Sequence, residues 1–286
     1  MQTELIFDVG LNVGQDTAFY LAQGYRVIAV EADPVLAESN RKRFQRAIEA
    51  GKLEIINVGI GKEEGFAQFW ISEGRPQFNS FHRDIAARDN WPHHSITIPT
   101  VRFANILQRY GTPYFLKIDI EGNDLLCLND LDPKSLPKYI SIESECPLSG
   151  EESTAADGLR TLAKLHSLGY SHFKLIDQRT FCSLSVPPSA NYILDRFARL
   201  WLLEPPFNRV RGSYWNSQRL MTKARLERKH RCEFPIGSSG VWGEDTVGQW
   251  MNVDKAERSY RVYREAHFSD KTKQPYSFWC DWHAKL

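Results

Sequence analysis

The sequence predicts an α/β protein built on a mostly parallel sheet with helices on both faces. Short apolar runs alternate with longer amphipathic segments over residues 1–200, which is the pattern of repeated strand–helix units. A glycine-containing turn separates the first apolar run from the first helical segment, and the second apolar run ends in Glu31. Both features are typical of nucleotide-like cofactor sites at the edge of a parallel sheet.

The expected elements follow from these runs and from the residues that flank them. Pro34 directly after Asp33 marks a helix start, and Gly51 and Gly169 lie where two helices should end. Strands are expected at Leu5–Val9, Val27–Glu31, Leu53–Val58, Phe115–Ile120, Tyr139–Glu143, His172–Ile176 and Tyr192–Leu194. Helices are expected at Gln15–Gln23, Pro34–Ala50, Phe103–Tyr110, Asn123–Leu128 and Ala155–Leu168.

The turn after the first strand carries polar residues that indicate the charge of its ligand. Gly10 and Gly14 flank Asn12, whereas a dinucleotide site usually has a third glycine in G-x-G-x-x-G spacing. Asp8 before the turn and Asp16 after it would repel a pyrophosphate. These groups suit a ligand with positive charges, such as S-adenosylmethionine. The alternative is an ordinary strand-to-helix turn.

Glu31 strengthens the cofactor interpretation. It stands at the end of the second strand, where a carboxylate can accept both ribose hydroxyls of an adenosine cofactor.

A second group of ionisable residues lies in the expected strand Phe115–Ile120 and just beyond it. Lys117, Asp119 and Glu121 share one face while the strand persists, because side chains alternate along a strand. Burying unpaired charges is costly, so this group indicates either a functional site or a structural ion pair with a helix N-cap. Glu143 ends the next strand, and for it a substrate or proton-transfer role and a structural role both stay open.

Together these motifs resemble the FkbM-type family of S-adenosylmethionine-dependent methyltransferases. The resemblance covers about residues 5–180 and rests on Asp8-Val9-Gly10-x-Asn12-x-Gly14, Glu31 and Lys117-Ile118-Asp119-Ile120-Glu121-Gly122. It implies a class I methyltransferase fold, Rossmann-like, with a seven-stranded sheet whose last strand is antiparallel. It also implies O-methylation of hydroxyls on sugars, glycans or secondary metabolites. Residues 237–246 look like a late segment of some members.

The resemblance also implies site residues. For the cofactor these are Asp8, Gly10, Asn12, Gly14, Gln15, Asp16, Thr17, Glu31, Asp33 and Ser80. For catalysis, Asp119 is the first candidate for the base or hydroxyl-orienting group, followed by Glu121 and Glu143, with Lys117 as an ion-pair partner. A base that acts near neutral pH needs a raised carboxylate pKa.

Two other functions stay open at this point. A nicotinamide-dependent oxidoreductase would use the same sheet, although Asn12 is unfavourable for close approach to a pyrophosphate. A non-catalytic binding module would use the same fold without turnover. No metal site is expected, because His93 and His94 fall in a segment expected to be a solvated polar loop.

Composition and charge indicate a globular protein of the cytoplasm. The chain has 286 residues, 42% of them hydrophobic, and a formal net charge of +1, so no nucleic-acid partner is expected. No apolar run is long enough for a transmembrane helix, and Glu4 and Asp8 interrupt any signal-peptide pattern. Five widely spaced cysteines favour reduced thiols over a disulfide framework.

Residues 201–286 are expected to form a C-terminal, Trp-rich extension to a cofactor-binding domain at 1–200. From Arg209 to Arg231 the extension has eight Lys or Arg residues against the single acid Glu227. This basic stretch is either a solvated helix face or a surface for an anionic partner or lipid headgroups. Six tryptophans, which fit either sugar stacking or a core, lie at positions 201, 215, 242, 250, 279 and 282. The expected acceptor is a small molecule or a glycan.

Overall fold

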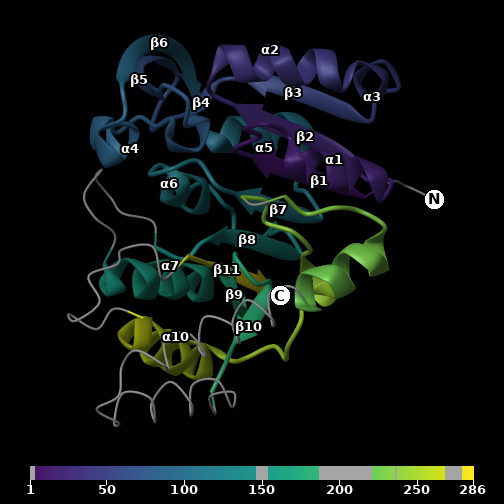
Figure 1. Ribbon diagram of the computed structural model, residues 1–286, viewed down its shortest axis with the longest axis vertical. Coiled ribbons are helices and arrows are strands. Elements are labelled where there is room, and N and C mark those ends of the chain that lie inside the picture. The colour runs from purple at the N-terminus through teal and green to yellow at the C-terminus, as the bar shows by residue number, and fades with distance from the viewer. Residues whose placement is uncertain (1–3, 146–153, 187–220, 236, 268–278) are drawn as a thin grey trace.

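The computed structural model describes residues 4–145, 154–186, 221–235, 237–267 and 279–286 (Figure 1). Its main sheet has eight strands in the order β10-β9-β11-β8-β7-β1-β2-β3. They are β1 (Leu5–Val9), β2 (Arg26–Glu31), β3 (Leu53–Asn57), β7 (Phe115–Ile118), β8 (Tyr139–Glu143), β9 (His172–Asp177), β10 (Cys182–Leu184) and β11 (Cys280–Lys285). The strand order reverses at β1, which has β2 on one side and β7 on the other.

The sheet is mostly parallel, as the sequence predicts. The antiparallel strands are β11, which lies between β8 and β9, and β10 at the edge beside β9. The sheet therefore has eight strands rather than the expected seven. The strands expected from the sequence do not include β11, although Cys280–Lys285 alternates apolar and polar residues as a strand does. The expected strand Tyr192–Leu194 lies outside the described residues.

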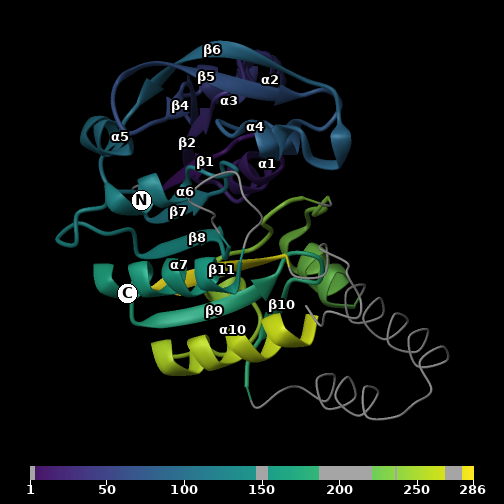
Figure 2. The same cartoon turned by 90° about the vertical axis from the view of Figure 1, so that its left-hand side faces the viewer.

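Helices cover both faces of the main sheet, and each face has its own apolar core. One face packs against α5 (Phe103–Tyr110), α6 (Asp124–Asn129), α7 (Ala155–Leu168) and α10 (Val253–His267). Of these helices, α7 and α10 lie side by side (Figure 2). The other face packs against α1 (Gln15–Ala22), α2 (Pro34–Arg43) and the helical residues 221–230. In the described parts of the chain, no helix has the length and apolar character needed to cross a bilayer.

The segment after β2 forms two helices where the sequence predicts one over Pro34–Ala50. The helix α2 ends at Arg43, Phe44 has a non-helical ψ of 19°, and α3 (Gln45–Glu49) follows. As expected, Asp33 begins α2: its Oδ1 accepts hydrogen bonds from the backbone N–H groups of Val35 (2.8 Å) and Leu36 (3.4 Å).

A second, three-stranded sheet follows β3 in the chain and lies at the same end of the molecule as β3 (Figure 1). It consists of β4 (Gly59–Ile60), β5 (Gly65–Ser72) and β6 (His93–Val101) in the order β4-β6-β5. The prediction of a solvated loop at His93 and His94 is wrong, because both residues pair with β5 at the start of β6. The short helix α4 (Arg83–Ala86) lies in the connection between β5 and β6.

Candidate active site

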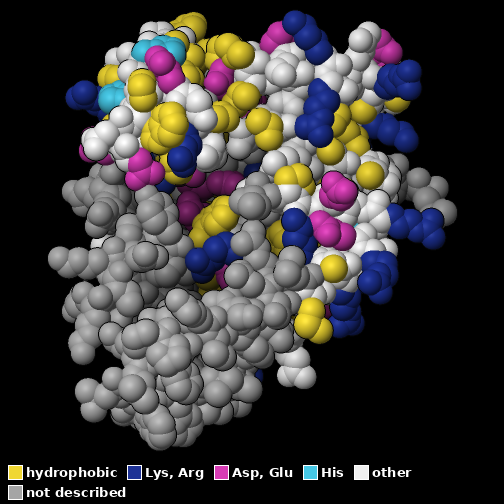
Figure 3. Space-filling model, in the orientation of Figure 1, with side chains coloured by type: hydrophobic (Ala, Val, Ile, Leu, Met, Phe, Trp, Pro, Cys, Tyr) yellow, Lys and Arg dark blue, Asp and Glu magenta, His cyan; other side chains and the backbone are white. Residues whose placement is uncertain are grey.

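The carboxyl ends of β1, β2 and β7 bring predicted site residues to one edge of the main sheet. Asp8 lies beside Lys117 of the neighbouring strand, Glu31 is the last residue of β2, and Asp119 follows β7. Ligands of open parallel sheets bind at this edge, near the reversal of strand order. Figure 3 shows acidic side chains at the bottom of a hollow on the side of the molecule to which these strands point.

Lys117 is the centre of a buried charge cluster. Its Nζ lies 2.8 Å from the carbonyl oxygen of Gly10, 3.2 Å from Asp8, 3.7 Å from Asp119 and 3.8 Å from Asp16. Burial alone would lower the pKa of Lys117, but the three carboxylates outweigh burial and raise this pKa above its usual value. The lysine therefore stays positively charged. Burial also raises the pKa of Asp16 to about 6, against the opposing effect of Lys117.

The two glycines of the first turn make room for other parts of the protein. A Cβ on Gly10 would lie 1.8 Å from the carbonyl oxygen of Asp119, and one on Gly14 would lie 2.4 Å from Oδ1 of Asn40. Both glycines also have positive φ angles, of 98° and 76°. They therefore allow the turn to pack closely against the segment after β7 and against α2.

Glu31 holds the same turn through two backbone hydrogen bonds. Its Oε2 accepts the N–H of Asn12 at 2.7 Å, and its Oε1 accepts the N–H of Asp33 at 2.8 Å. Asn40 donates to the carbonyl oxygen of Asn12 at 2.6 Å. Burial raises the pKa of Glu31 to about 7, although the two N–H groups oppose the shift. Each oxygen of this carboxylate retains a lone pair for a further donor.

Three other predicted cofactor residues use their side chains within the protein. Oδ2 of Asp33 accepts a hydrogen bond from Asn79 (2.9 Å), while its Oδ1 caps α2. The buried hydroxyl of Ser80 donates to the carbonyl oxygen of Glu121 at 2.6 Å. Thr17 donates to Oδ2 of Asp8, also at 2.6 Å. These contacts join the second sheet, α1 and the segment after β7 around the same edge.

The segment after β7 turns before Glu121, so the alternation predicted for Lys117, Asp119 and Glu121 does not extend to Glu121. The strand ends at Ile118, and Glu121 has a φ of 52°. Its carboxylate forms an ion pair with Arg88 at 3.3 Å, while the Asp119 side chain is 39% exposed. Burial raises the pKa of Glu121 to about 8, although Arg88 opposes the shift.

Asp124, at the start of α6, fixes the shape of this turn. Its Oδ1 accepts the N–H of Ile120 at 3.0 Å, and its Oδ2 accepts the N–H of Gly122 at 2.9 Å. The side chain is fully buried. The backbone on either side of Glu121 is thereby held by one carboxylate.

Glu143 gains a neighbour that the sequence analysis missed. The register of β8 and β11 places Asp281 beside Glu143. Burial raises the pKa of Glu143 well above its usual value, and Glu121 and Asp119 raise it further. Burial raises the pKa of Asp281 to about 7, again with a contribution from Asp119. The alternation of apolar and polar residues over Cys280–Lys285 could have indicated a strand, but not that this strand pairs with β8 and brings Asp281 to Glu143.

The late segment 237–246 closes the site from the side of α1. The buried carboxylate of Asp16 accepts the backbone N–H groups of Ser239 (3.0 Å) and Gly240 (3.4 Å). Gln15 lies next to Gly237, with its Oε1 3.8 Å from where a Cβ of Gly237 would be. Residues that are more than 200 positions apart in the chain therefore meet at one wall of the site.

The C-terminal tryptophans do not all fit the expectation of sugar stacking. Trp282 is fully buried in the core, where its Nε1 donates to the carbonyl oxygen of Gly158. Trp242 packs against Phe115 on the opposite side of the sheet from Trp282. Trp201 and Trp215 lie outside the described residues, as do residues 209–220 of the basic stretch.

Comparison with known proteins gives one family. The family model described as "Methyltransferase FkbM domain" matches residues 8–171, which include the end of β1, the turn at Gly10, Glu31, β7 and the segment after it. No curated protein sequence matches the chain.

Solved structures give only distant similarity. The C-terminal domain of precorrin-6Y C5,15-methyltransferase from Rhodobacter capsulatus is 14% identical, over 62% of this chain and 68% of that one, with a TM-score of 0.36. A SAM-dependent methyltransferase from Thiobacillus denitrificans, in complex with S-adenosyl-L-homocysteine, is 10% identical, over 99% and 84%, with a TM-score of 0.32. At these TM-scores the similarities carry no argument about this chain's chemistry.

Proposed function

The chain belongs to the FkbM methyltransferase domain family, whose methyl donor is S-adenosylmethionine, and on this premise we propose that it methylates a hydroxyl oxygen of a polyhydroxylated small molecule or glycan. The observation that carries the proposal is the set of acidic side chains with raised pKa values at the carboxyl edge, around the half-exposed Asp119. The hydroxyl groups of such a substrate need hydrogen-bond acceptors and donors, and carboxyl groups supply both.

The residues at the turn after β1 fit the cofactor. Oδ1 of Asn12 is buried and has no hydrogen-bond partner among the described residues, so it offers an acceptor to a positively charged or N–H group. The remaining lone pairs of Glu31 suit the two ribose hydroxyls. Asp8, Asp16 and Asp119 place negative charge beside them, which favours a cationic ligand. When bound, S-adenosylmethionine supplies an electrophilic methyl group on its positively charged sulfur.

In this proposal Asp119 takes up the proton of the acceptor hydroxyl. Its side chain is the exposed member of the Lys117 cluster and is the one that solvent and substrate can reach. Burial raises the pKa of Glu121 to about 8, against the effect of Arg88, so a large share of Glu121 is protonated at neutral pH, and burial shifts the pKa of Glu143 in the same direction. A protonated carboxyl group both donates and accepts hydrogen bonds, as recognition of neighbouring hydroxyls requires.

Two further expectations stay predictions. The basic stretch 209–231 is proposed as a surface for an anionic partner, although in its described part Lys223 pairs with Glu227 and Lys229 with Asp245. A cytoplasmic location is proposed because Cys127, Cys182, Cys232 and Cys280 are free thiols in the structure.

Calorimetric titration followed by a turnover assay tests the proposed function. S-adenosylmethionine and S-adenosylhomocysteine should bind, and NAD should not. The complex should then transfer a radiolabelled methyl group to members of a panel of glycans and polyols. Label transferred to nitrogen or carbon atoms instead would contradict O-methylation, and cofactor binding without any turnover across the panel would favour a non-catalytic module.

The variant Asp119→Asn separates chemistry from binding. It should lower kcat by about 10²–10⁴-fold, the range of a lost general base, and leave the Kd for S-adenosylmethionine within about threefold. Glu73→Gln, at an exposed position in the turn after β5, is the matched control and should leave both constants unchanged. An active Asp119→Asn protein would remove Asp119 as the base.

A further inference from the structure

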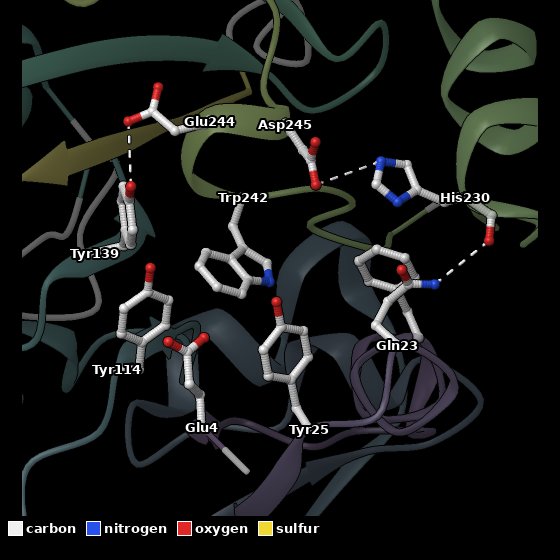
Figure 4. A pocket seen from close by; sticks show the side chains of 10 residues that line it. Glu4, Gln23, Tyr25, Tyr114, Tyr139, His230, Trp242, Glu244 and Asp245 are labelled. Carbon is white, nitrogen blue, oxygen red and sulfur yellow. Dashed lines mark hydrogen bonds and ion pairs between the residues drawn. The ribbon is translucent and has the colours of Figure 1, made fainter. Parts of the chain in front are cut away.

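A cavity of about 180 Å³ lies at the opposite edge of the sheet from the proposed active site (Figure 4). Glu4 precedes β1, Tyr25 precedes β2, Tyr114 precedes β7 and Tyr139 begins β8, and all four line this cavity. They mark the amino ends of the strands. The five residues of β1 separate the two edges by about 16 Å, so the cavity is not part of the methyl-transfer site.

Aromatic rings form a box in this cavity. Trp242 stacks on Phe115 with ring centroids 4.4 Å apart and an interplanar angle of 8°, so one indole face is covered. Tyr25, Tyr114 and Tyr139 meet the indole at 5.5–5.7 Å and at angles of 58–74°. Figure 4 shows the indole between Tyr25 and Tyr114, with Tyr139 beyond Tyr114. The tyrosines are walls, and the indole is the floor.

The charges in the lining have one sign. The carboxylates of Glu4, Glu244 and Asp245 line the cavity, whereas no Lys or Arg does so among the described residues. The lining also contains the imidazole of His230. Burial lowers the pKa of this imidazole, so it is neutral at pH 7.

Glu4 is the carboxylate left for a ligand. Glu244 is paired with Lys285 at 2.7 Å, and Asp245 is paired with Lys229. Glu4 has no ion pair within the described part of the chain, and Figure 4 shows its carboxylate between Tyr114 and Tyr25. A carboxylate among ring faces is the arrangement that binds organic ammonium ions.

The tyrosine rings already attract a cation from outside the cavity. The ammonium of Lys138 lies 5.2 Å from the ring centroid of Tyr114 and 5.4 Å from that of Tyr139, and Lys138 itself does not line the cavity. We propose that the box formed by Tyr25, Tyr114, Tyr139 and Trp242, with Glu4 at its side, is a binding site for a small organic cation carrying a methylated or quaternary ammonium group. This site is independent of the proposed methyl transfer.

Titration of the full chain with choline, followed by calorimetry and saturation-transfer NMR, tests the site. Choline should bind, and its uncharged isostere 3,3-dimethylbutan-1-ol should bind at least about 10-fold more weakly, because the ring faces and Glu4 favour charge. Binding should persist with saturating S-adenosylhomocysteine. Equal binding of the isostere, tighter binding of a neutral monosaccharide, displacement by S-adenosylhomocysteine or no binding of choline would each overturn the proposal.

Two variants locate the binding. Glu4→Gln removes an exposed charge without disturbing the core and should weaken choline binding by about 5-fold or more. Tyr25→Leu removes one wall and should weaken it further. The control Glu38→Gln, an exposed carboxylate on α2, should bind choline as the parent does. Unchanged affinity in both Glu4→Gln and Tyr25→Leu would place the cation elsewhere and contradict the assignment.

Discussion

Lys117 and Asp8 are register neighbours on β7 and β1, and their side chains form an ion pair of 3.2 Å in which the lysine side chain is 4% exposed and the aspartate is fully buried. One buried cation therefore balances carboxylates from three different segments. The pair ties the cofactor turn to the segment that carries the proposed base. The pair matters for stability because loss of the lysine would leave buried carboxylates without a counter-ion.

Lys117→Met should destabilise the protein by about 3–5 kcal/mol, because it leaves Asp8 and Asp16 as buried carboxylates without their counter-ion. Chemical denaturation at pH 7 measures this loss. The control Lys42→Met removes an exposed lysine from α2 and should change the free energy of unfolding by less than about 0.5 kcal/mol. A loss below about 1 kcal/mol for Lys117→Met would mean that the carboxylates find other partners.

Glu31 should make cofactor binding depend on pH. Its pKa is raised by burial to about 7, and only its ionised form can accept hydrogens from both ribose hydroxyls. The affinity for S-adenosylhomocysteine should therefore increase between pH 6 and pH 8. Glu31→Gln should cost about 1.5–3 kcal/mol of binding free energy at pH 8 and should lose this part of the pH dependence. Parallel pH profiles for the two proteins would show that Glu31 does not contact the ribose.

The free energy of unfolding of the cofactor-free protein should fall as the pH rises from 6.5 to 8, below the range in which the lowered pKa of Lys174 has the opposite effect. Burial raises the pKa of Asp281 from 3.8 to about 7 and that of Glu121 from 4.5 to about 8. A carboxyl group with a raised pKa contributes stability below its unfolded pKa, and this contribution is lost as the pH passes its folded pKa. Burial lowers the pKa of His283 to about 3. This residue therefore changes the free energy of unfolding only below pH 6.5, which is its pKa in the unfolded chain.

Urea denaturation across this pH range measures the slope. Asp281→Asn should flatten it near pH 7, and Glu121→Gln should flatten it near pH 8. A free energy of unfolding that rises over this range would contradict the burial of these carboxyl groups.

Asp124→Ala should destabilise the protein and slow turnover. It leaves the N–H groups of Ile120 and Gly122 without their acceptor, at a cost of about 1–3 kcal/mol for each buried group. Turnover should fall more than cofactor affinity, because the turn carries Asp119. Asp132→Ala removes a comparable but exposed backbone contact, to the N–H of Lys134, and is the control. Equal effects of the two substitutions would mean that the turn keeps its shape without Asp124.

The sequence predicts well where apolar runs and local chemistry agree. The bounds of β1, β8, α5 and α7 match the expectation, because each is rich in apolar residues with the spacing of its element. Asp8, Lys117 and Asp119 were expected to belong to the site region, and the structure brings their charges together.

The features that the sequence does not predict depend on contacts between distant segments. Asp281 meets Glu143 only because β11 enters the sheet beside β8. Arg88 reaches Glu121 from the connection between β5 and β6, and Ser239 reaches Asp16 from the late segment. The roles of Gly10 and Gly14 in packing are also set by neighbours that no local pattern names.

The position of β11 also sets the timing of folding. The strands β8 and β9 follow one another among the strands of the main sheet in chain order, but they do not pair with each other. The edges of β8 and β9 that face each other both pair with β11. During synthesis, the 108 positions from Asp177 to Lys285 take about 5–20 s to be added at the usual rate. Over that interval two apolar strand edges are open to wrong partners. We expect the nascent chain to need protection until β11 has left the ribosome, and a circular permutant whose chain begins with β11 would remove this wait.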